Sequence, residues 1–165
     1  MKTNAVRLLD QAKVPYRLVE YEVDESDLSA ESVARKIGMR DEEVFKTLAL
    51  KGDKTGVLLV LVPAGTELDL KAIAQASGNK RCEMLSLKDV QPVTGYIRGG
   101  VSPIGTKKRF PVYLDQSATE HATISISAGV RGTQILLSPA DLVRMVQATL
   151  APVAKPAGSP SAEVE

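Results

Sequence analysis

The sequence predicts a mixed α/β domain with a curved, largely antiparallel or barrel-like sheet and surrounding helices. Helical and short extended segments follow one another without regular strand-helix-strand alternation, and most extended segments are joined by hairpins or irregular turns. One segment, residues 57–62, is apolar at every position, which is typical of a strand covered on both faces. With 165 residues, 44% of them apolar, the chain can bury a substantial core, so we expect a single domain over residues 1–150.

The N-terminal quarter is predicted to contain two helices and one strand. Residues 3–13 form the first helix, which begins at a threonine cap and which a proline two residues later prevents from continuing. Residues 16–23 alternate as a strand does, with Tyr21 facing inward. The second helix, residues 29–37, stops at the glycine that follows it.

The centre of the sheet is expected to be a pair of strands. A short acidic turn precedes the first strand, residues 44–50, and a hairpin-type connection over residues 51–56 leads into the second, residues 57–62.

The second half of the chain adds shorter elements, each bounded by a capping residue, a glycine or a proline. They are helices over residues 69–77, 86–90 and from 138 onward, and strands over residues 111–115, 123–127 and 134–137. The helix over residues 86–90 is expected to end before Pro92. From residue 151 to residue 165 the composition narrows mainly to small residues, proline, valine and glutamate, which predicts a disordered C-terminal tail.

Composition and charge exclude several classes of protein. The 21 basic and 20 acidic side chains give a formal net charge of +1, so the chain is not a polycation that binds DNA or RNA indiscriminately. No apolar stretch approaches the length of a membrane span and the start lacks the apolar block of a signal peptide, so we expect a cytoplasmic protein with no membrane partner. A single cysteine and a single histidine argue against a zinc site, and we expect no metal and no cofactor.

Lys46 is the first candidate site residue. It shares one face of its predicted strand with Val44, Leu48 and Leu50. Leaving an ammonium unpaired among aliphatic side chains costs several kcal/mol, so a ligand, a partner charge or a lowered pKa is expected there. The alternative is a lysine whose stem packs while its ammonium reaches water.

A glycine-rich segment, residues 94–105, is the second candidate. It holds four glycines and a proline in twelve residues, and glycine lets the backbone approach a ligand without an intervening Cβ. The basic triplet Lys107-Lys108-Arg109 follows it, either as a set of phosphate contacts or as a solvated turn.

A protein nucleophile is hard to identify. Basic neighbours could lower the pKa of the Cys82 thiol, but no spacing pairs Cys82 with His121, and a buried structural cysteine is the simpler interpretation. Ser102 lacks the helical continuation of a nucleophile elbow, and the glycines lack the spacing of a Walker loop. A lysine, a tyrosine, hydroxyls and backbone donors remain, which suit positioning a ligand and stabilising an oxyanion. The nucleophile of any reaction would then come from the substrate or from water.

Six segments stand in order between about residues 3 and 150: Val19-Glu20-Tyr21-Glu22, Phe45-Lys46-Thr47-Leu48, Leu68-Asp69-Leu70-Lys71, Gly95 to Gly105, Lys107-Lys108-Arg109, and Ser127-Ala128-Gly129-Val130-Arg131-Gly132. Together they resemble the YbaK/EbsC family, the free-standing relatives of the editing domain inserted in bacterial prolyl-tRNA synthetases. The resemblance implies the fold of that editing domain and a deacylase that removes cysteine mischarged onto proline tRNA, Cys-tRNA(Pro). Cysteine and proline are close in volume, and a small apolar pocket separates near-isosteres by only about 1–3 kcal/mol, so a second, editing site is useful.

The resemblance also implies roles for particular residues. Lys46 would hold the 3′-terminal adenosine or the aminoacyl ester, while Gly99 and Gly100 would shape the pocket and supply backbone donors. The thiol of the substrate would attack its own ester carbonyl and leave as a cyclic thioester. The other candidates for substrate binding are Tyr21, Phe45, Thr47, Ser102, Pro103, Ser127, Gly129 and Gln134, and the candidates for tRNA contact are Arg98, Lys107, Lys108 and Arg109.

Gln134 departs from the family pattern, because some members carry an acidic residue just after the Arg-Gly turn. This departure leaves the amino acid that is removed open. A deacylase for another small amino acid, such as alanine or serine, is one alternative, and a non-catalytic module that binds tRNA or a synthetase is another. The expected partners are proline tRNA and prolyl-tRNA synthetase, since the near-neutral charge suggests that a partner supplies much of the tRNA affinity.

Overall fold

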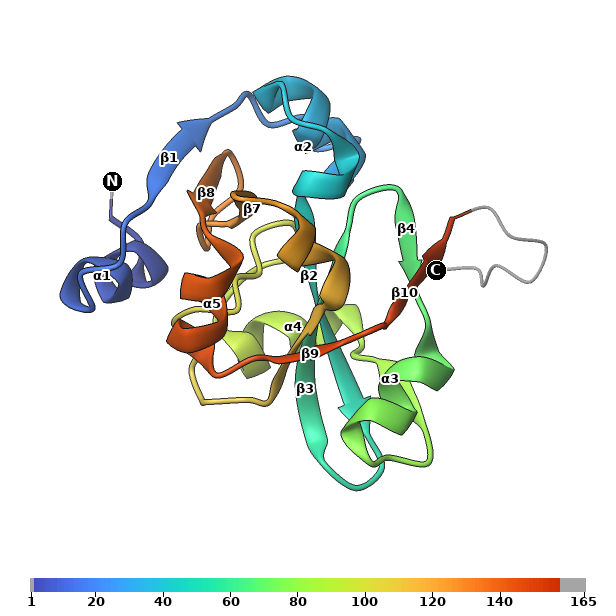
Figure 1. Ribbon diagram of the computed structural model, residues 1–165. Coiled ribbons are helices and arrows are strands. Elements are labelled where there is room, and N and C mark those ends of the chain that lie inside the picture. Colours follow the sequence, from blue (N-terminus) through green and yellow to red (C-terminus); the bar gives the residue numbers. More distant parts are fainter. Residues whose placement is uncertain (1, 158–165) are drawn as a thin grey trace.

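Three β-sheets form the framework of residues 2–157, the part of the chain that the computed structural model describes, and α-helices pack around them (Figure 1). The five-stranded sheet has the order β5 (Cys82–Met84), β2 (Phe45–Gly52), β3 (Gly56–Pro63), β6 (Val112–Asp115) and β9 (Thr149–Ala151). The three-stranded sheet has the order β1 (Arg17–Glu20), β8 (Thr133–Leu137) and β7 (Ile124–Ser127), and the two-stranded sheet pairs β10 (Ala154–Pro156) with β4 (Thr66–Leu68). Figure 1 shows the β4 and β10 pair at one side of the molecule and the first helix at the opposite side.

The helices begin and end at the residues that capping chemistry predicts. They are α1 (Asn4–Gln11), α2 (Ala30–Ile37), α3 (Leu70–Ser77), α4 (Leu87–Thr94) and α5 (Pro139–Val146), with 3₁₀ turns η1 (Asp41–Glu43) and η2 (Gln116–Glu120). The side chains of Thr3, Ser29, Asp69 and Ser138 each accept a hydrogen bond from the backbone N–H three residues later. Four of the five predicted helices are therefore confirmed together with their caps.

The β2–β3 hairpin is the centre of the larger sheet, and β3 is buried on both faces, both as predicted. Leu59 and Leu61 pack into one core cluster with residues of α1, β7, β8 and α5. Leu58, Val60 and Val62 pack into a second cluster, beside α3. The mixed α/β class is confirmed and most strand pairs are antiparallel, although β3–β6 and β6–β9 are parallel and the sheets are open.

Two predicted boundaries are wrong. Helix α4 continues through Pro92 to Thr94 and its expected cap, Ser86, makes no capping hydrogen bond. A proline removes only one backbone donor from this short helix, whose end is closed by the Thr94 hydroxyl on the Val90 carbonyl at 2.7 Å. The tail predicted from residue 151 also starts too early, because β10 pairs with β4 and Val153 is fully buried. The rest of the predicted tail, residues 158–165, lies outside the described residues.

Candidate functional site

The N-terminal end of β2 lies where the two larger sheets meet. Val44, just before β2, forms an isolated parallel bridge with Ser125 of β7. The two strands run in the same direction from this bridge, so Lys46 and Ser127 each lie two residues beyond it. The chain thereby brings two of its predicted site residues to neighbouring strands.

Lys46 is half-buried and its ammonium contacts backbone rather than a carboxylate. Its Nζ donates a hydrogen bond of 2.9 Å to the carbonyl oxygen of Thr66, in β4. Leu48 and Leu50, which share its strand face, pack into the second core cluster. The lysine stem therefore lies on an aliphatic surface while the ammonium is held at a defined position.

The turn that receives the Lys46 ammonium is itself fixed by neighbouring elements. The Thr66 hydroxyl donates to the Pro63 carbonyl at 2.6 Å, and the backbone N–H of Gly65 donates to a carboxylate oxygen of Glu31 in α2. An Asp41 carboxylate oxygen would lie 3.3 Å from a Cβ at Gly65, so a second acid borders the same turn. Helix α2 and turn η1 thus determine where the Lys46 side chain ends.

Polar side chains are buried on one face of the three-stranded sheet. Ser125 is 0% exposed, Gln134 5% and Ser127 8%, and the Ser125 hydroxyl donates to Gln134 Oε1 at 2.7 Å. Ser127 pairs directly with Gln134 across the strands, and its hydroxyl accepts from the Gly129 N–H at 3.1 Å. In β2, the Thr47 hydroxyl is buried without a hydrogen-bond partner among the described residues. Unpaired buried hydroxyls cost about 1–3 kcal/mol, and Thr47 faces the side of β2 opposite to Lys46, so its free hydrogen-bonding capacity is not directed at the Lys46 ammonium.

The glycine-rich segment packs against the turn between β7 and β8. A Cβ added to Gly100 would lie 3.2 Å from backbone atoms of Val130 and Arg131, so only glycine allows this close approach. The N–H of Gly100 already donates to the Ile97 carbonyl at 2.9 Å, so the prediction that Gly100 supplies a free backbone donor is wrong. Gly100 instead allows the glycine-rich segment to lie close to the turn between β7 and β8. Gly99 has a φ of +83°, and Arg131 Nε donates to the neighbouring Arg98 carbonyl at 2.8 Å.

Tyr96 connects this segment to the turn from inside the protein. Its hydroxyl donates to the Ile104 carbonyl at 2.7 Å, and its ring fills the space beside Gly129, where an added Cβ would lie 2.7 Å from a ring carbon. Burial raises the pKa of the Tyr96 phenol above its usual value. Tyr96 therefore holds the glycine-rich segment and the 128–132 turn in register.

Tyr21 and Phe45 reach the same region in different ways. Tyr21 donates its backbone N–H to the Gly132 carbonyl at 2.9 Å and packs with Val44 in a small apolar cluster under α2. Phe45 is 2% exposed and belongs to the core cluster that contains Leu59 and Leu61, so its side chain acts in packing.

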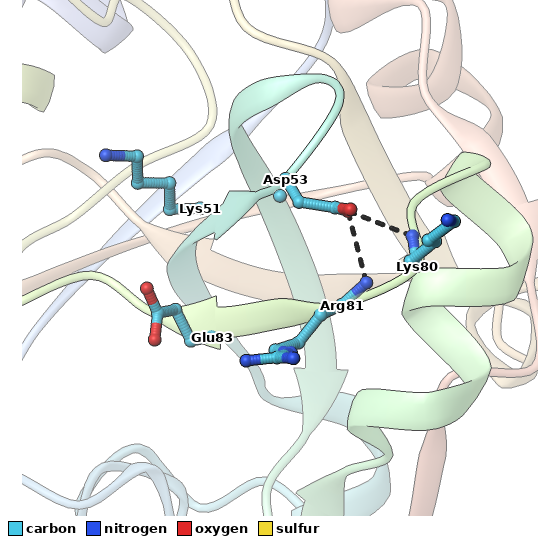
Figure 2. A pocket seen from close by; sticks show the side chains of 6 residues that line it. Lys51, Asp53, Lys80, Arg81 and Glu83 are labelled. Atoms are coloured by element: carbon cyan, nitrogen blue, oxygen red, sulfur yellow. Dashed lines mark hydrogen bonds between the residues drawn. The ribbon is translucent and has the colours of Figure 1, made fainter.

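Other predicted site residues lie apart from Lys46. Ser102 is fully buried and its hydroxyl accepts from the Ile104 N–H at 3.3 Å. Pro103 and the triplet Lys107-Lys108-Arg109 line a cavity of about 250 Å³ between α1 and the end of α5. A cavity of about 340 Å³, lined by Lys51, Asp53, Lys80, Arg81 and Glu83, lies at the far end of β2 (Figure 2). Lys46 lines neither of these two cavities.

The two side chains most capable of nucleophilic catalysis are also elsewhere. Cys82 is 5% exposed in the second core cluster, where its sulfur accepts from Asn79 Nδ2 at 3.5 Å. His121 follows η2, and its backbone N–H closes that turn. Among residues 2–157 no group of three or more His, Cys, Asp or Glu side chains could hold a metal ion, and no helix is long and apolar enough to cross a membrane.

Sequence reasoning missed several residues of this region. Ser125 alternates with Ile124 and Ile126 in β7, and that pattern could have indicated a polar sheet face. Glu31 and Thr66 carried no such signal, because their contacts join segments far apart in the chain, whereas Arg131 stands within the 127–132 motif and its contact with Arg98 was not expected.

The fold and this region define a small α/β domain whose candidate site combines one positioned lysine, buried hydroxyls and closely packed glycine backbone. Residues 24–145 match the model of the aminoacyl-tRNA editing domain, and the chain belongs to this family. It is 49% identical over 152 residues to an Enterococcus faecalis protein provisionally named Cys-tRNA(Pro)/Cys-tRNA(Cys) deacylase EbsC, covering 92% of this chain and 93% of the relative.

Two further comparisons support the family and the fold. The chain is 26% identical to the Multifunctional Ser/Thr-tRNA deacylase ProXp-y of Escherichia coli (strain K12), over 88% of this chain and 87% of the relative. A crystal structure described provisionally as a trans-editing enzyme for prolyl-tRNA synthetase superposes with a TM-score of 0.80 at 23% identity, covering 94% of this chain and 99% of that one. The latter likeness concerns the fold.

Proposed function

We propose that the protein is an aminoacyl-tRNA deacylase that removes cysteine from mischarged Cys-tRNA(Pro) in trans. The observation that carries this proposal is the neighbourhood of Lys46, where a positioned ammonium lies on a strand next to the buried polar side chains of β7 and β8, without a protein thiol or imidazole beside it. Membership of the editing family and the name of the Enterococcus faecalis relative support the same substrate class.

Each group near β2 has a role in this proposal. The Lys46 ammonium exchanges its contact with the Thr66 carbonyl for the ester or the terminal ribose of the substrate, and stabilises negative charge that develops on the carbonyl oxygen. Gly99 and Gly100 shape the wall of the pocket against the 128–132 turn. Ser127 and Gln134 offer polar contacts to the aminoacyl group, and Tyr21 borders the site through its backbone contact with Gly132.

The nucleophile in this proposal is the substrate. The cysteine thiol gives its proton to water, and the sulfur attacks the carbonyl carbon of the same residue. The bond from that carbon to the ribose oxygen then breaks, the ribose oxygen takes a proton, and cysteine leaves as a cyclic thioester that water opens. A thiol is a few per cent thiolate near pH 7 and intrinsically reactive, so no activated protein side chain is needed.

Serine is the second candidate, favoured by the name of the Escherichia coli relative. A seryl or alanyl ester lacks the thiol, so its hydrolysis needs a water molecule activated in the site. A binding module without turnover would use the same contacts but release no amino acid. We place the reaction in the cytoplasm, with proline tRNA as substrate and prolyl-tRNA synthetase as the partner that supplies tRNA affinity.

The test replaces Lys46 by methionine, which keeps the stem and removes the charge. Lys51→Met is the matched control, because Lys51 is an exposed lysine of the same strand that lies apart from the site. Under multiple turnover with Cys-tRNA(Pro), Lys46→Met should lose at least about 100-fold in kcat/KM while unfolding cooperatively, since the ammonium stabilises developing charge. Lys51→Met should behave as wild type. Activity above half of wild type in Lys46→Met would reject the role of Lys46, and a wild-type protein without turnover would reject the enzyme.

A further inference from the structure

The cavity of about 250 Å³ under the basic triplet has an unusual combination of walls. Leu8 of α1 and Met145 and Val146 of α5 supply apolar side chains, and Phe110 supplies an aromatic ring. Lys107, Lys108 and Arg109 are exposed at its rim, and its lining contains no acidic residue.

Two of the three rim cations are available to a ligand. Lys107 donates to the Pro92 carbonyl at 3.2 Å, which fixes its side chain over α4. Within residues 2–157, the side chains of Lys108 and Arg109 have no hydrogen bond or ion pair. Their charges are therefore free to meet an anion.

The charges that line the other cavity make it a poorer site for an anion than the cavity under the basic triplet. Its cations Lys51, Lys80 and Arg81 share the lining with Asp53 and Glu83 (Figure 2). Asp53 accepts backbone N–H groups of Lys80 and Arg81 at 2.9 and 3.1 Å, and these bonds hold the pKa of its carboxyl below the usual value. A carboxylate held ionised inside that cavity opposes an anionic ligand, whereas nothing in the lining under the triplet does so.

We propose that the cavity under the basic triplet binds one unstacked nucleotide of the substrate RNA. The base lies on the apolar wall against Phe110 and Met145, and the attached phosphate is held by Lys108 and Arg109. Single-stranded RNA is recognised in this way, by stacking on aromatic side chains combined with cationic contacts to the backbone. This inference rests on the proposed function, because the RNA is the substrate of the Lys46 site.

The nucleotide bound here is distinct from the one that carries the ester. Lys46 does not line this cavity, and the chain from Gly100 to Lys108 passes through the buried residues Val101 to Ile104 before it reaches the rim. The Tyr96 hydroxyl fixes that connection at Ile104. A rigid link between the two sites would set the distance between two nucleotides of one RNA strand.

The test measures the dissociation constant of uncharged tRNA as a function of salt. Lys108→Ala/Arg109→Ala should weaken binding and lower the salt dependence, by about 0.7 in the slope of log K against log salt for each single-strand phosphate that the protein no longer neutralises. Lys80→Ala/Arg81→Ala removes the same charge at the other cavity and should change neither. Equal effects of the two double variants would overturn the proposed site, because they would show that the net charge of the protein alone determines its affinity for tRNA.

A second variant tests the base. Phe110→Leu keeps an apolar wall but removes the ring, so it should weaken binding by about tenfold without altering the salt slope. Thermal unfolding of Phe110→Leu and of a wild-type sample establishes that the variant is folded. Wild-type affinity in folded Phe110→Leu would overturn the base-binding part of the proposal. If the wild type binds tRNA through these residues but releases no amino acid, the proposed function fails and the binding site stands. If the wild type deacylates its substrate while all these variants bind tRNA normally, the binding site fails and the proposed function stands.

Discussion

Gly100→Ala probes how closely the glycine-rich segment approaches the 128–132 turn. The added Cβ would lie 3.2 Å from three backbone atoms of Val130 and Arg131, where carbon contacts ordinarily lie at about 3.5–4.0 Å. A flexible side chain could rotate away, but the backbone of a short turn cannot. The two segments must therefore separate by about 0.3–0.8 Å to reach ordinary contact.

This separation should affect both stability and rate. Overpacking of this kind lowers the free energy of unfolding by about 1–3 kcal/mol. A displacement approaching 1 Å in a site that orients its substrate costs up to about 100-fold in rate, so we expect kcat/KM to fall by about 10- to 100-fold.

The assay is multiple-turnover deacylation of Cys-tRNA(Pro), with urea unfolding of the same samples. Gly78→Ala is the matched control, because Gly78 has a φ of +80° at the end of α3 with no atom within 4 Å of an added Cβ. Its left-handed backbone should cost about 1–2 kcal/mol of stability without touching the site. Wild-type kinetics in Gly100→Ala would refute the close approach as a requirement for turnover, and an equal activity loss in Gly78→Ala would attribute the effect to instability.

Two further variants test the elements that support the site. Tyr96→Phe should lower the free energy of unfolding by about 0.5–1.5 kcal/mol, seen as a lower urea midpoint, because the Ile104 carbonyl loses its donor. Burial raises the pKa of the Tyr96 phenol, so the wild type should keep full stability below about pH 10 and lose it as the pH rises further, and an equal alkaline loss in Tyr96→Phe would contradict this. Glu31→Ala releases the Gly65–Thr66 turn that holds Lys46 and should lower kcat by a factor of about 3–10. Glu42→Ala, an exposed acid of η1, is its control, and equal kcat values for the two variants would exclude a positioning role for Glu31.

Local chemistry made much of the fold predictable. Helix caps such as Ser29 and Asp69 act within three residues, and the alternation around Lys46 correctly placed it among Leu48 and Leu50. The three-residue strands β4 and β10 are too short to show a period, and they form because Val153 is buried and the following backbone pairs with residues 66–68. They could not be predicted from the local pattern.

The candidate site was predictable where a residue type carries its own signal. Lys46 is conspicuous because it interrupts an aliphatic face, and Gly99 and Gly100 because glycine permits close approach. The partners of these residues depend on tertiary packing, as in the contact of Lys46 with Thr66 and the donation of the Gly100 N–H to Ile97. The latter removes the expected backbone donor at Gly100 and leaves its close approach to the 128–132 turn.

The identity of the nucleophile distinguishes substrate-assisted cleavage from hydrolysis by an activated water or by a protein thiol. The measurement compares the deacylation of cysteinyl and seryl esters on the same proline tRNA by the wild type and by Cys82→Ala. Substrate-assisted cleavage predicts that Cys82→Ala matches the wild type, because Cys82 lies in the second core cluster, and that the seryl ester reacts at least about tenfold more slowly, because a hydroxyl is a poorer nucleophile. Equal rates for the two esters would contradict it in favour of an activated water, and loss of activity in folded Cys82→Ala would contradict it in favour of a protein thiol.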